Sequence, residues 1–294
     1  MSKIDKMILT REAALFYEEA FMPAIYEQWP PFLLGAANTK TGDRILDVGC
    51  GTGALAREAV RRVAPDGEVT GLDLSESMLS IARQNCPDAT WQQGDASQLP
   101  FEDASFDVVA SPFMLMFLPE PVQAVREMWR VLAVGGRLVI SVWEGLHQNP
   151  VFASLTGIAR RRISGEVGAS LAQPFALGRE GSLEDIYHQA GIEEARFDTE
   201  HGRVRFPSVD LFIRSEIKNW LLADEIDEDI IKLIIEDARE AFKDYIDVDG
   251  HFDCPLNARL AKATKQSVIT TEEAPTRSVV IPRATGEPPE PSGT

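Results

Sequence analysis

Between residues 44 and 143 the sequence alternates short apolar runs with amphipathic runs. The apolar runs are typical of buried strands, and three helical patterns lie between them, over 53–64, 75–85 and 120–132. Strands separated by helices of this length connect through right-handed crossovers into a mostly parallel sheet. The alternation therefore predicts an α/β fold with a doubly wound sheet. Its expected strands are 44–48, 68–74, 89–95, 105–111 and 137–143.

The regular alternation ends after residue 143. A helix over 182–192, with Ser182 as its N-cap, and a strand over 193–204 precede a mainly helical, acid-rich stretch. A strand after that stretch would return to the sheet and bring it to seven strands. We expect five regions along the chain. A helical segment over 1–40 would cover the functional site, and it is followed by a core over 41–205, a helical lid insertion over 206–249 and a returning core strand over 250–267. The last region, 268–294, should be a disordered tail, because its Pro, Glu, Thr and Gly residues leave little to bury.

The acidic composition narrows the range of partners. The chain of 294 residues carries a formal net charge of -17, which repels phosphate backbones and anionic lipid surfaces. We therefore expect no nucleic-acid partner. No apolar run is long enough to span a membrane, and the charged N-terminus lacks the apolar core of a signal peptide. Three separated cysteines and four scattered histidines have no metal-site spacing, so we predict free thiols, no metal and a cytoplasmic location.

A glycine-rich loop follows the first predicted strand. Gly49, Gly51 and Gly53 alternate with other residues and lead directly into a helix. Glycine is costly because it loses much conformational freedom on folding, so its repetition here suggests that a ligand approaches the backbone. The amides of residues 49–53 and the helix N-terminus would face that ligand. Asp73 ends the next strand, where a carboxylate can accept both hydroxyls of a ribose.

Two acids indicate which nucleoside this is. Asp47 stands two residues before the first glycine and would repel the pyrophosphate of a dinucleotide, and the loop reads GxGxG rather than GxGxxG. A dehydrogenase is therefore disfavoured. Asp95, after the third strand, could accept the exocyclic amine of an adenine. Asp47, Asp73 and Asp95 together fit S-adenosylmethionine, whose ammonium and sulfonium groups suit an acidic site. The alternatives are structural: Asp47 and Asp95 as turn residues, and Asp73 as a helix cap.

Four segments carry a resemblance to a known family: ILDVGCGTG, GLDLSESML, GDASQLPFEDASFDVV and REMWRVLAVGGRLVISVW. In this order and spacing they resemble the class I S-adenosylmethionine-dependent methyltransferases, and the flanking segments are similar to the ubiquinone/menaquinone C-methyltransferase group. The resemblance implies a Rossmann-like methyltransferase fold with S-adenosylmethionine as cofactor. The cofactor-binding residues would be Asp47, Gly49, Cys50, Gly51, Gly53, Asp73, Leu74, Met78, Gly94, Asp95, Ala96 and Ser111.

The acceptor side is predicted from aromatic and apolar residues near the ends of the fourth and fifth strands. A small apolar or aromatic molecule, attacking through O, C or N, would suit them. His147 is our candidate general base, and Tyr17 our candidate for closing over the cofactor. Core packing is the alternative for the pocket residues, which are Tyr26, Trp29, Phe113, Met116, Phe117 and Trp143.

Other functions remain open at this point. The protein could bind S-adenosylmethionine without transferring a methyl group, or it could methylate a protein. Transfer to adenine N6 is disfavoured, because SPFM stands after the fourth strand where an Asn-Pro-Pro-Tyr-like motif would be expected. A homodimer is compatible with everything in the sequence.

Overall fold

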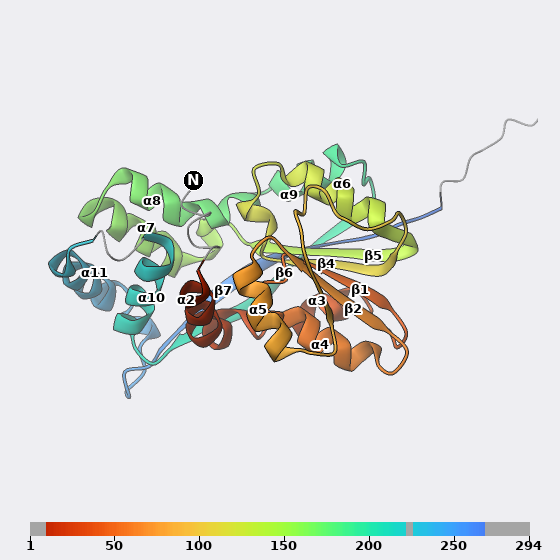
Figure 1. Ribbon diagram of the computed structural model, residues 1–294. Helices are drawn as coiled ribbons and strands as arrows, with labels where there is room; N and C mark the ends of the chain where they lie inside the picture. Colours follow the sequence, from red (N-terminus) through yellow and green to blue (C-terminus); the bar gives the residue numbers. More distant parts are fainter. Residues whose placement is uncertain (1–9, 222–225, 268–294) are drawn as a thin grey trace, which may run out of the picture.

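The computed structural model describes residues 10–221 and 226–267, with side chains omitted for 218–221, and over these residues it forms one seven-stranded sheet (Figure 1). The strand order is β3-β2-β1-β4-β5-β7-β6. Strands β1 to β5 run parallel, and β7 is antiparallel to both of its neighbours. The predicted mostly parallel sheet is thereby confirmed. The strands are β1 (Arg44–Val48), β2 (Glu68–Asp73), β3 (Thr90–Gln93), β4 (Phe106–Pro112), β5 (Leu132–Trp143), β6 (Ala195–Phe206) and β7 (Phe252–Thr264).

Helices cover both faces of the sheet (Figure 1). One face carries α3 (Pro30–Ala36), α4 (Ala54–Val63) and α5 (Glu76–Asn85), and the other carries α6 (Pro121–Val131) and α9 (Ser182–Gln189). Their sequences explain this placement. Leu55, Ala59 and Val63 fall on one side of α4 and are buried there. Helix α5 begins as predicted, because the Ser75 hydroxyl accepts a hydrogen bond from the Met78 N–H at 3.3 Å.

One predicted cap is wrong. Ser182 is the first residue of α9, and Gly181 occupies the N-cap position with a φ of 81°. The left-handed backbone of Gly181 makes the turn into the helix, so no side-chain cap is formed there. The end of this helix follows the expected pattern, since Gly191 stands just beyond it with a φ of 84°.

A group of helices gathers at one end of the sheet, which we call the helical cap (Figure 1). Helix α7 packs on α8 and α11, and α10 packs on α8, α11 and the N-terminal helix η1 (Tyr17–Tyr26). Short helix α2 (Arg11–Phe16) precedes η1 and packs on α5. The cap consists of α7 (Pro150–Arg162), α8 (Gly165–Ala172), η4 (Gln173–Gly178), α10 (Val209–Leu221) and α11 (Glu228–Ala241).

The predicted domain boundaries stay predictions, but the structure adds a detail to them. Residues 150–178, which the sequence assigns to the core, are helical and belong to the cap. Residues 1–9 of the expected N-terminal segment and the expected tail over 268–294 lie outside the described residues. Within the described part of the chain, none of the helices has the length and hydropathy that crossing a membrane requires.

Strands β6 and β7 form a long antiparallel ribbon. They pair from Ala195↔Ala263 to Phe206↔Phe252, whereas β7 pairs with β5 only as far as Trp143↔Ala258. The ribbon therefore continues past the sheet towards the cap. At its tip the ring of Phe252 stacks on Phe212 of α10, with 4.8 Å between the ring centroids. This contact attaches the cap to the sheet.

Candidate functional site

The glycine loop joins β1 to α4 in a left-handed backbone conformation. Gly49, Gly51 and Gly53 have φ values of 71°, 53° and 88°, which favour glycine over any side chain. Packing adds a second reason at two of these positions. A Cβ on Gly49 would collide with Met114, and one on Gly53 would lie 2.6 Å from the Trp91 ring. Gly51 differs, because a Cβ there would meet only Tyr17, at 4.0 Å, so this glycine alone opens onto space beside the loop.

The amides of residues 49, 50, 51 and 53 are bonded within the protein, which corrects the expectation that the loop amides face a ligand. The N–H groups of Gly49 and Cys50 both donate to the Leu72 carbonyl, at 2.8 and 3.1 Å, and the Gly53 N–H donates to the Cys50 carbonyl at 2.9 Å. The Gly51 N–H donates to Asp73 Oδ2 at 2.8 Å. These bonds hold the loop against the end of β2. A ligand would therefore be recognised mainly by side chains and by the shape of the loop.

Asp73 ties the loop to the start of α5. Its Oδ2 accepts the Gly51 N–H, and its Oδ1 accepts the Ser75 N–H at 2.8 Å. Desolvation by burial raises the pKa of this carboxyl, while the amides of Ser75, Gly51 and Leu74 act against that rise. Each carboxylate oxygen can accept more than one hydrogen bond, so both oxygens keep capacity for a hydroxyl donor. Leu74, the next residue, is exposed beside it.

Asp47 is the least satisfied acid of the site. It lies within β1 between Gly71 of β2 and Ala110 of β4, and its side chain is fully buried. Neither carboxylate oxygen has a partner in full hydrogen-bonding geometry among the described residues, although the Ala56 N–H at the start of α4 lies close by. Desolvation raises the pKa of Asp47 to about 8; the Ala56 N–H acts against this rise, and the nearby charge of Asp73 adds to it. A buried carboxyl in this state favours a ligand that brings a positive charge or a hydrogen-bond donor.

Tyr17 covers the loop from helix η1. Its ring lies near Gly51 and 5.3 Å from the Tyr26 ring, measured between centroids. Burial raises the pKa of the Tyr17 hydroxyl well above its usual value, and Tyr26, Asp73 and Asp47 add to the effect because they lie close by. The structure thus brings Tyr17 together with both acids.

Glu18 fixes the position of η1, and it is not among the residues that the sequence analysis predicts for the site. Its Oε1 accepts hydrogen bonds from Arg57 of α4 at 3.1 Å and from Asn85 of α5 at 2.9 Å. The first of these contacts is also a half-buried ion pair. The N-terminal helix is therefore anchored on the two helices that follow the glycine loop and β2. This places Tyr17 over the loop.

Two predicted cofactor residues are engaged within the protein. Asp95 is exposed, and its Oδ1 accepts the backbone N–H and the hydroxyl of Ser97 at 2.8 and 2.7 Å, which makes a local turn. Ser111 is buried and donates its hydroxyl to the Val48 carbonyl at 3.0 Å. Their roles toward a cofactor stay predictions. The remaining predicted residues lie at the same edge of the sheet, after β1, β2 and β3: Cys50, Met78, Gly94 and Ala96.

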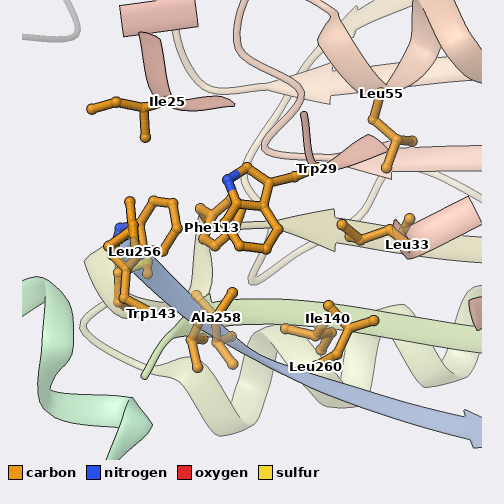
Figure 2. Packing of buried hydrophobic residues seen from close by; sticks show 14 of the residues in the cluster. Ile25, Trp29, Leu33, Leu55, Phe113, Ile140, Trp143, Leu256, Ala258 and Leu260 are labelled. Atoms are coloured by element: carbon orange, nitrogen blue, oxygen red, sulfur yellow. The ribbon is translucent and has the colours of Figure 1, made fainter. Parts of the chain in front are cut away.

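An aromatic cluster stands beside the loop, at the ends of β4 and β5 (Figure 2). Phe113 stacks on Trp143 with 3.8 Å between ring centroids, and Trp29 meets both rings edge-on at 5.3 and 5.7 Å. Phe113 has a φ of 54°, which is unusual for a bulky residue and occurs where surrounding packing holds the backbone. Tyr26 contacts Phe113 and Trp143, each at 5.8 Å. Tyr26 thereby links this cluster to Tyr17.

A cavity opens between this cluster and the helical cap. About 480 Å³ is free of protein atoms there when the open space at the mouth is included, and apolar side chains form most of the wall. Tyr26 and Trp143 are the predicted pocket residues that line it, and Phe152 and Phe175 of the cap lie opposite them. Glu216 of α10 is one of the few polar residues on the wall. Sequence reasoning missed the cap residues because residues 144–181 have no regular pattern.

The other predicted acceptor residues lie outside the cavity wall. Phe113 packs behind Trp143, and Met116 is buried on the short helix η2 (Leu115–Phe117), where its carbonyl accepts a hydrogen bond from Gln173 at 2.6 Å. Phe117 is half-buried on the same turn. These three residues support the wall through packing.

His147 is not brought together with the other site residues. It lies exposed on the turn η3 (Leu146–Gln148), folded back beside Gly145, and it does not line the cavity. Its role as a general base stays a prediction. Among the described residues one group has the spacing of metal ligands: Asp247, Asp249 and His251. All three are exposed, and Asp247 accepts the backbone N–H groups of the other two at 2.9 Å, which explains the group as a turn.

Comparison with known proteins relates the part of the chain around the glycine loop to a known family. Residues 46–140, which span β1 to β5, match the family model described as "Methyltransferase domain". Over these residues the chain is similar to methyltransferase domains. The match contains the glycine loop, Asp47 and Asp73, and it ends before the helical cap begins.

Similar proteins agree with this match over part of the chain. The ubiquinone/menaquinone biosynthesis C-methyltransferase UbiE of Pseudomonas paraeruginosa is 38% identical over 122 residues, which are 40% of this chain and 48% of that protein. The demethylmenaquinone methyltransferase of Listeria welshimeri is 37% identical over 119 residues, 39% of this chain and 50% of that protein. The chain thus spans about half the length of these relatives.

Solved structures extend the likeness of the fold beyond the matched domain. The YcgJ protein of Bacillus subtilis aligns with 81% of this chain and 98% of its own, with a TM-score of 0.52 and 19% identity. Phosphoethanolamine N-methyltransferase 2 of Haemonchus contortus, in complex with S-adenosyl-L-methionine, aligns with 87% of this chain and 58% of its own, with a TM-score of 0.54 and 20% identity. At these identities the likeness concerns the fold alone.

Proposed function

We propose that this protein transfers a methyl group from S-adenosylmethionine to a small apolar or aromatic acceptor. The observation that carries the proposal is the buried carboxylate of Asp47, which has no partner in full hydrogen-bonding geometry among the described residues and stands next to a loop that opens at Gly51. A buried acid without such a partner costs free energy, and a cationic ligand that reaches it offsets this cost.

The residues around Asp47 fit this cofactor. Asp47 would pair with its ammonium group, Asp73 has hydrogen-bonding capacity left for the ribose hydroxyls, and Gly51 leaves room beside the loop. Tyr17 would close the site from above. When bound, S-adenosylmethionine supplies a methyl group that is already activated by its sulfonium.

The protein's own contribution is then to position the acceptor and to exclude water. Tyr26 touches both Tyr17 and the aromatic cluster, so the cofactor cleft and the cavity share a wall. Rings of the cluster and of the cap make this wall apolar. An apolar or aromatic acceptor would lose its hydration shell on entering and would be held by ring contacts.

The names of the two bacterial relatives point to quinone precursors as one acceptor class. We include a quinone-type phenol among the acceptors for this reason, although the relatives match only about 40% of this chain. A cytoplasmic location, the absence of a nucleic-acid partner and a homodimer are further parts of this proposal that rest on the sequence.

Titration calorimetry with S-adenosylmethionine and S-adenosylhomocysteine is the first test, and we expect both to bind. The second is the formation of S-adenosylhomocysteine in the presence of phenols, amines and quinone precursors. If neither nucleoside binds, the protein does not use S-adenosylmethionine and the proposal is wrong. If both bind and no acceptor in the series is methylated, a protein that binds the cofactor without transfer becomes the better reading.

A further inference from the structure

Glu216 combines deep burial with a position on the wall of the cavity. It lies on α10 with 4% of its surface exposed, and its neighbours along the helix, Ser215 and Ile217, are equally buried. Helix α10 packs on η1, which carries Tyr26. A carboxylate in an apolar wall is unfavourable for stability, because burial removes the water that solvates its charge.

The other buried acids of the described residues lie away from the cavity wall. Asp43 is paired with Arg137, and Glu144 accepts a hydrogen bond from Thr199 at 2.6 Å with Arg259 at 3.7 Å. Asp47 stands at the glycine loop. Glu216 is the buried acid that borders the cavity. A molecule that enters the cavity therefore meets Glu216 on its wall.

Aromatic rings surround the same space. Tyr26 and Trp143 line one side, and Phe21, Phe152 and Phe175 complete the wall, with Phe152 and Phe175 in contact at 5.1 Å between ring centroids. The charge of Glu216 acts on one of these residues, Tyr26. Burial is the larger cause and the Glu216 charge the smaller one, and together they raise the pKa of the Tyr26 hydroxyl. Ring faces beside a carboxylate are the combination that binds organic ammonium groups.

We propose that the methyl acceptor is an amphipathic amine, whose ammonium group binds beside the Glu216 carboxylate and the rings of Tyr26 and Trp143, with its apolar body among the rings of the cap. For transfer the ammonium gives one proton to the Glu216 carboxylate, and the nitrogen lone pair then forms the bond to the methyl carbon. The bond between that carbon and the sulfonium breaks, and S-adenosylhomocysteine leaves with its electron pair. The proposal rests on the proposed function and names its substrate class. The net charge of -17 acts in the same direction, since an acidic protein attracts cationic molecules and repels carboxylates.

The test compares three ligands of similar size: phenethylamine, phenethyl alcohol and hydrocinnamate. Binding to the full chain, alone and loaded with S-adenosylhomocysteine, is followed by calorimetry and by the fluorescence of the tryptophans, because Trp143 lines the cavity. We expect the amine to bind about tenfold more tightly than the alcohol, as a charge-assisted hydrogen bond predicts, and the carboxylate to bind least.

Glu216→Gln is the decisive variant, because the amide keeps the shape of the side chain and removes its charge. The preference for the amine over the alcohol should disappear, while the affinity for S-adenosylhomocysteine stays unchanged. Asp210→Asn is the matched control: it removes one acid from the same helix, but Asp210 faces outwards in an ion pair with Arg239, so the preference should persist. Thermal unfolding of both variants establishes that they are folded, and Glu216→Met, an apolar side chain of similar length, replaces Glu216→Gln if that variant is not.

Three outcomes overturn the proposal: equal affinity of the wild type for amine and alcohol, a preference that survives in Glu216→Gln, or a preference that Asp210→Asn also removes. With Glu216→Met the amine preference should disappear as well, since the carboxylate is removed, and its survival would equally contradict the proposal. The failure of the proposed function is seen separately, as an absence of S-adenosylhomocysteine binding in the wild type.

Discussion

The two halves of the site are built in different ways. The cofactor half comes from residues close together in sequence, where the loop after β1 is bonded to the end of β2 and Asp47 and Asp73 stand beside it. The acceptor half comes from side chains on η1, β5, β7 and the helical cap, which are far apart in the chain. The first half depends on backbone conformation, and the second on how helices pack. Substitutions in the two halves should therefore affect different ligands.

The largest expected effect lies in the cofactor half. Gly51→Val should remove measurable binding of S-adenosylhomocysteine in calorimetry, because the side chain fills the space that Gly51 leaves open. Its φ of 53° adds backbone strain of about 1–3 kcal/mol. Gly35→Val is the control, since Gly35 lies exposed on α3 with nothing near its Cβ position. Wild-type affinity in Gly51→Val would show that the cofactor does not pass this residue.

Asp47→Asn should have two opposite effects. Cofactor affinity should fall by about 1.5–3 kcal/mol, as for the loss of a hydrogen bond to a charged group, while the cofactor-free protein becomes more stable. The pKa of about 8 sets the sign of the second effect. The folded protein keeps a proton on Asp47 that the unfolded chain releases near pH 4, so wild-type stability falls between about pH 4 and 8 as the pH rises.

Thermal and calorimetric measurements across this pH range check both effects. The gap in melting temperature between Asp47→Asn and the wild type should widen from pH 4 to 8 and then level off. Wild-type affinity for the cofactor should increase towards pH 8, because a cationic ligand favours the ionised carboxyl and displaces its proton. A flat affinity profile that Asp47→Asn does not change would separate Asp47 from the ligand.

A smaller effect, on the other ligand, is expected in the acceptor half. Phe175→Leu should raise the KM for the acceptor by several-fold, which corresponds to about 1 kcal/mol for a modest change of shape in a packed wall, and leave cofactor affinity unchanged. Phe32→Leu, at a partly exposed phenylalanine on α3, is the control and should change neither value. A loss of cofactor affinity in Phe175→Leu would break the division between the two halves.

The smallest effect is expected at His147. Its exposed position on η3, away from the cavity, leads us to expect less than about a twofold change in kcat for His147→Gln, as for surface substitutions in general. Kinetics at saturating cofactor and acceptor measure it. A large fall in kcat with unchanged cofactor affinity would instead support the general-base role suggested by the sequence.

These contrasts also explain what the sequence could predict. The strands, the cap of α5 by Ser75 and the position of Asp73 follow from local patterns, in which hydrophobic periodicity and glycine positions decide the backbone. The reasons for individual glycines were not predictable, because Met114 and Trp91 reach Gly49 and Gly53 from distant elements. The same holds for Glu216 and the cap rings, whose burial depends on how α7 and α10 pack.

The pairing of β6 with β7 bears on which parts of this fold can vary in evolution. The chain leaves the ribbon at Phe206 and re-enters it at Phe252, and these two residues are paired with each other. The segment that contains α10 and α11 therefore begins and ends at neighbouring residues. It can be lengthened, shortened or exchanged without altering the strands beneath. Because Glu216 lies in this segment, its exchange would alter the proposed contact with the acceptor and leave the proposed cofactor site beside β1 and β2 unchanged.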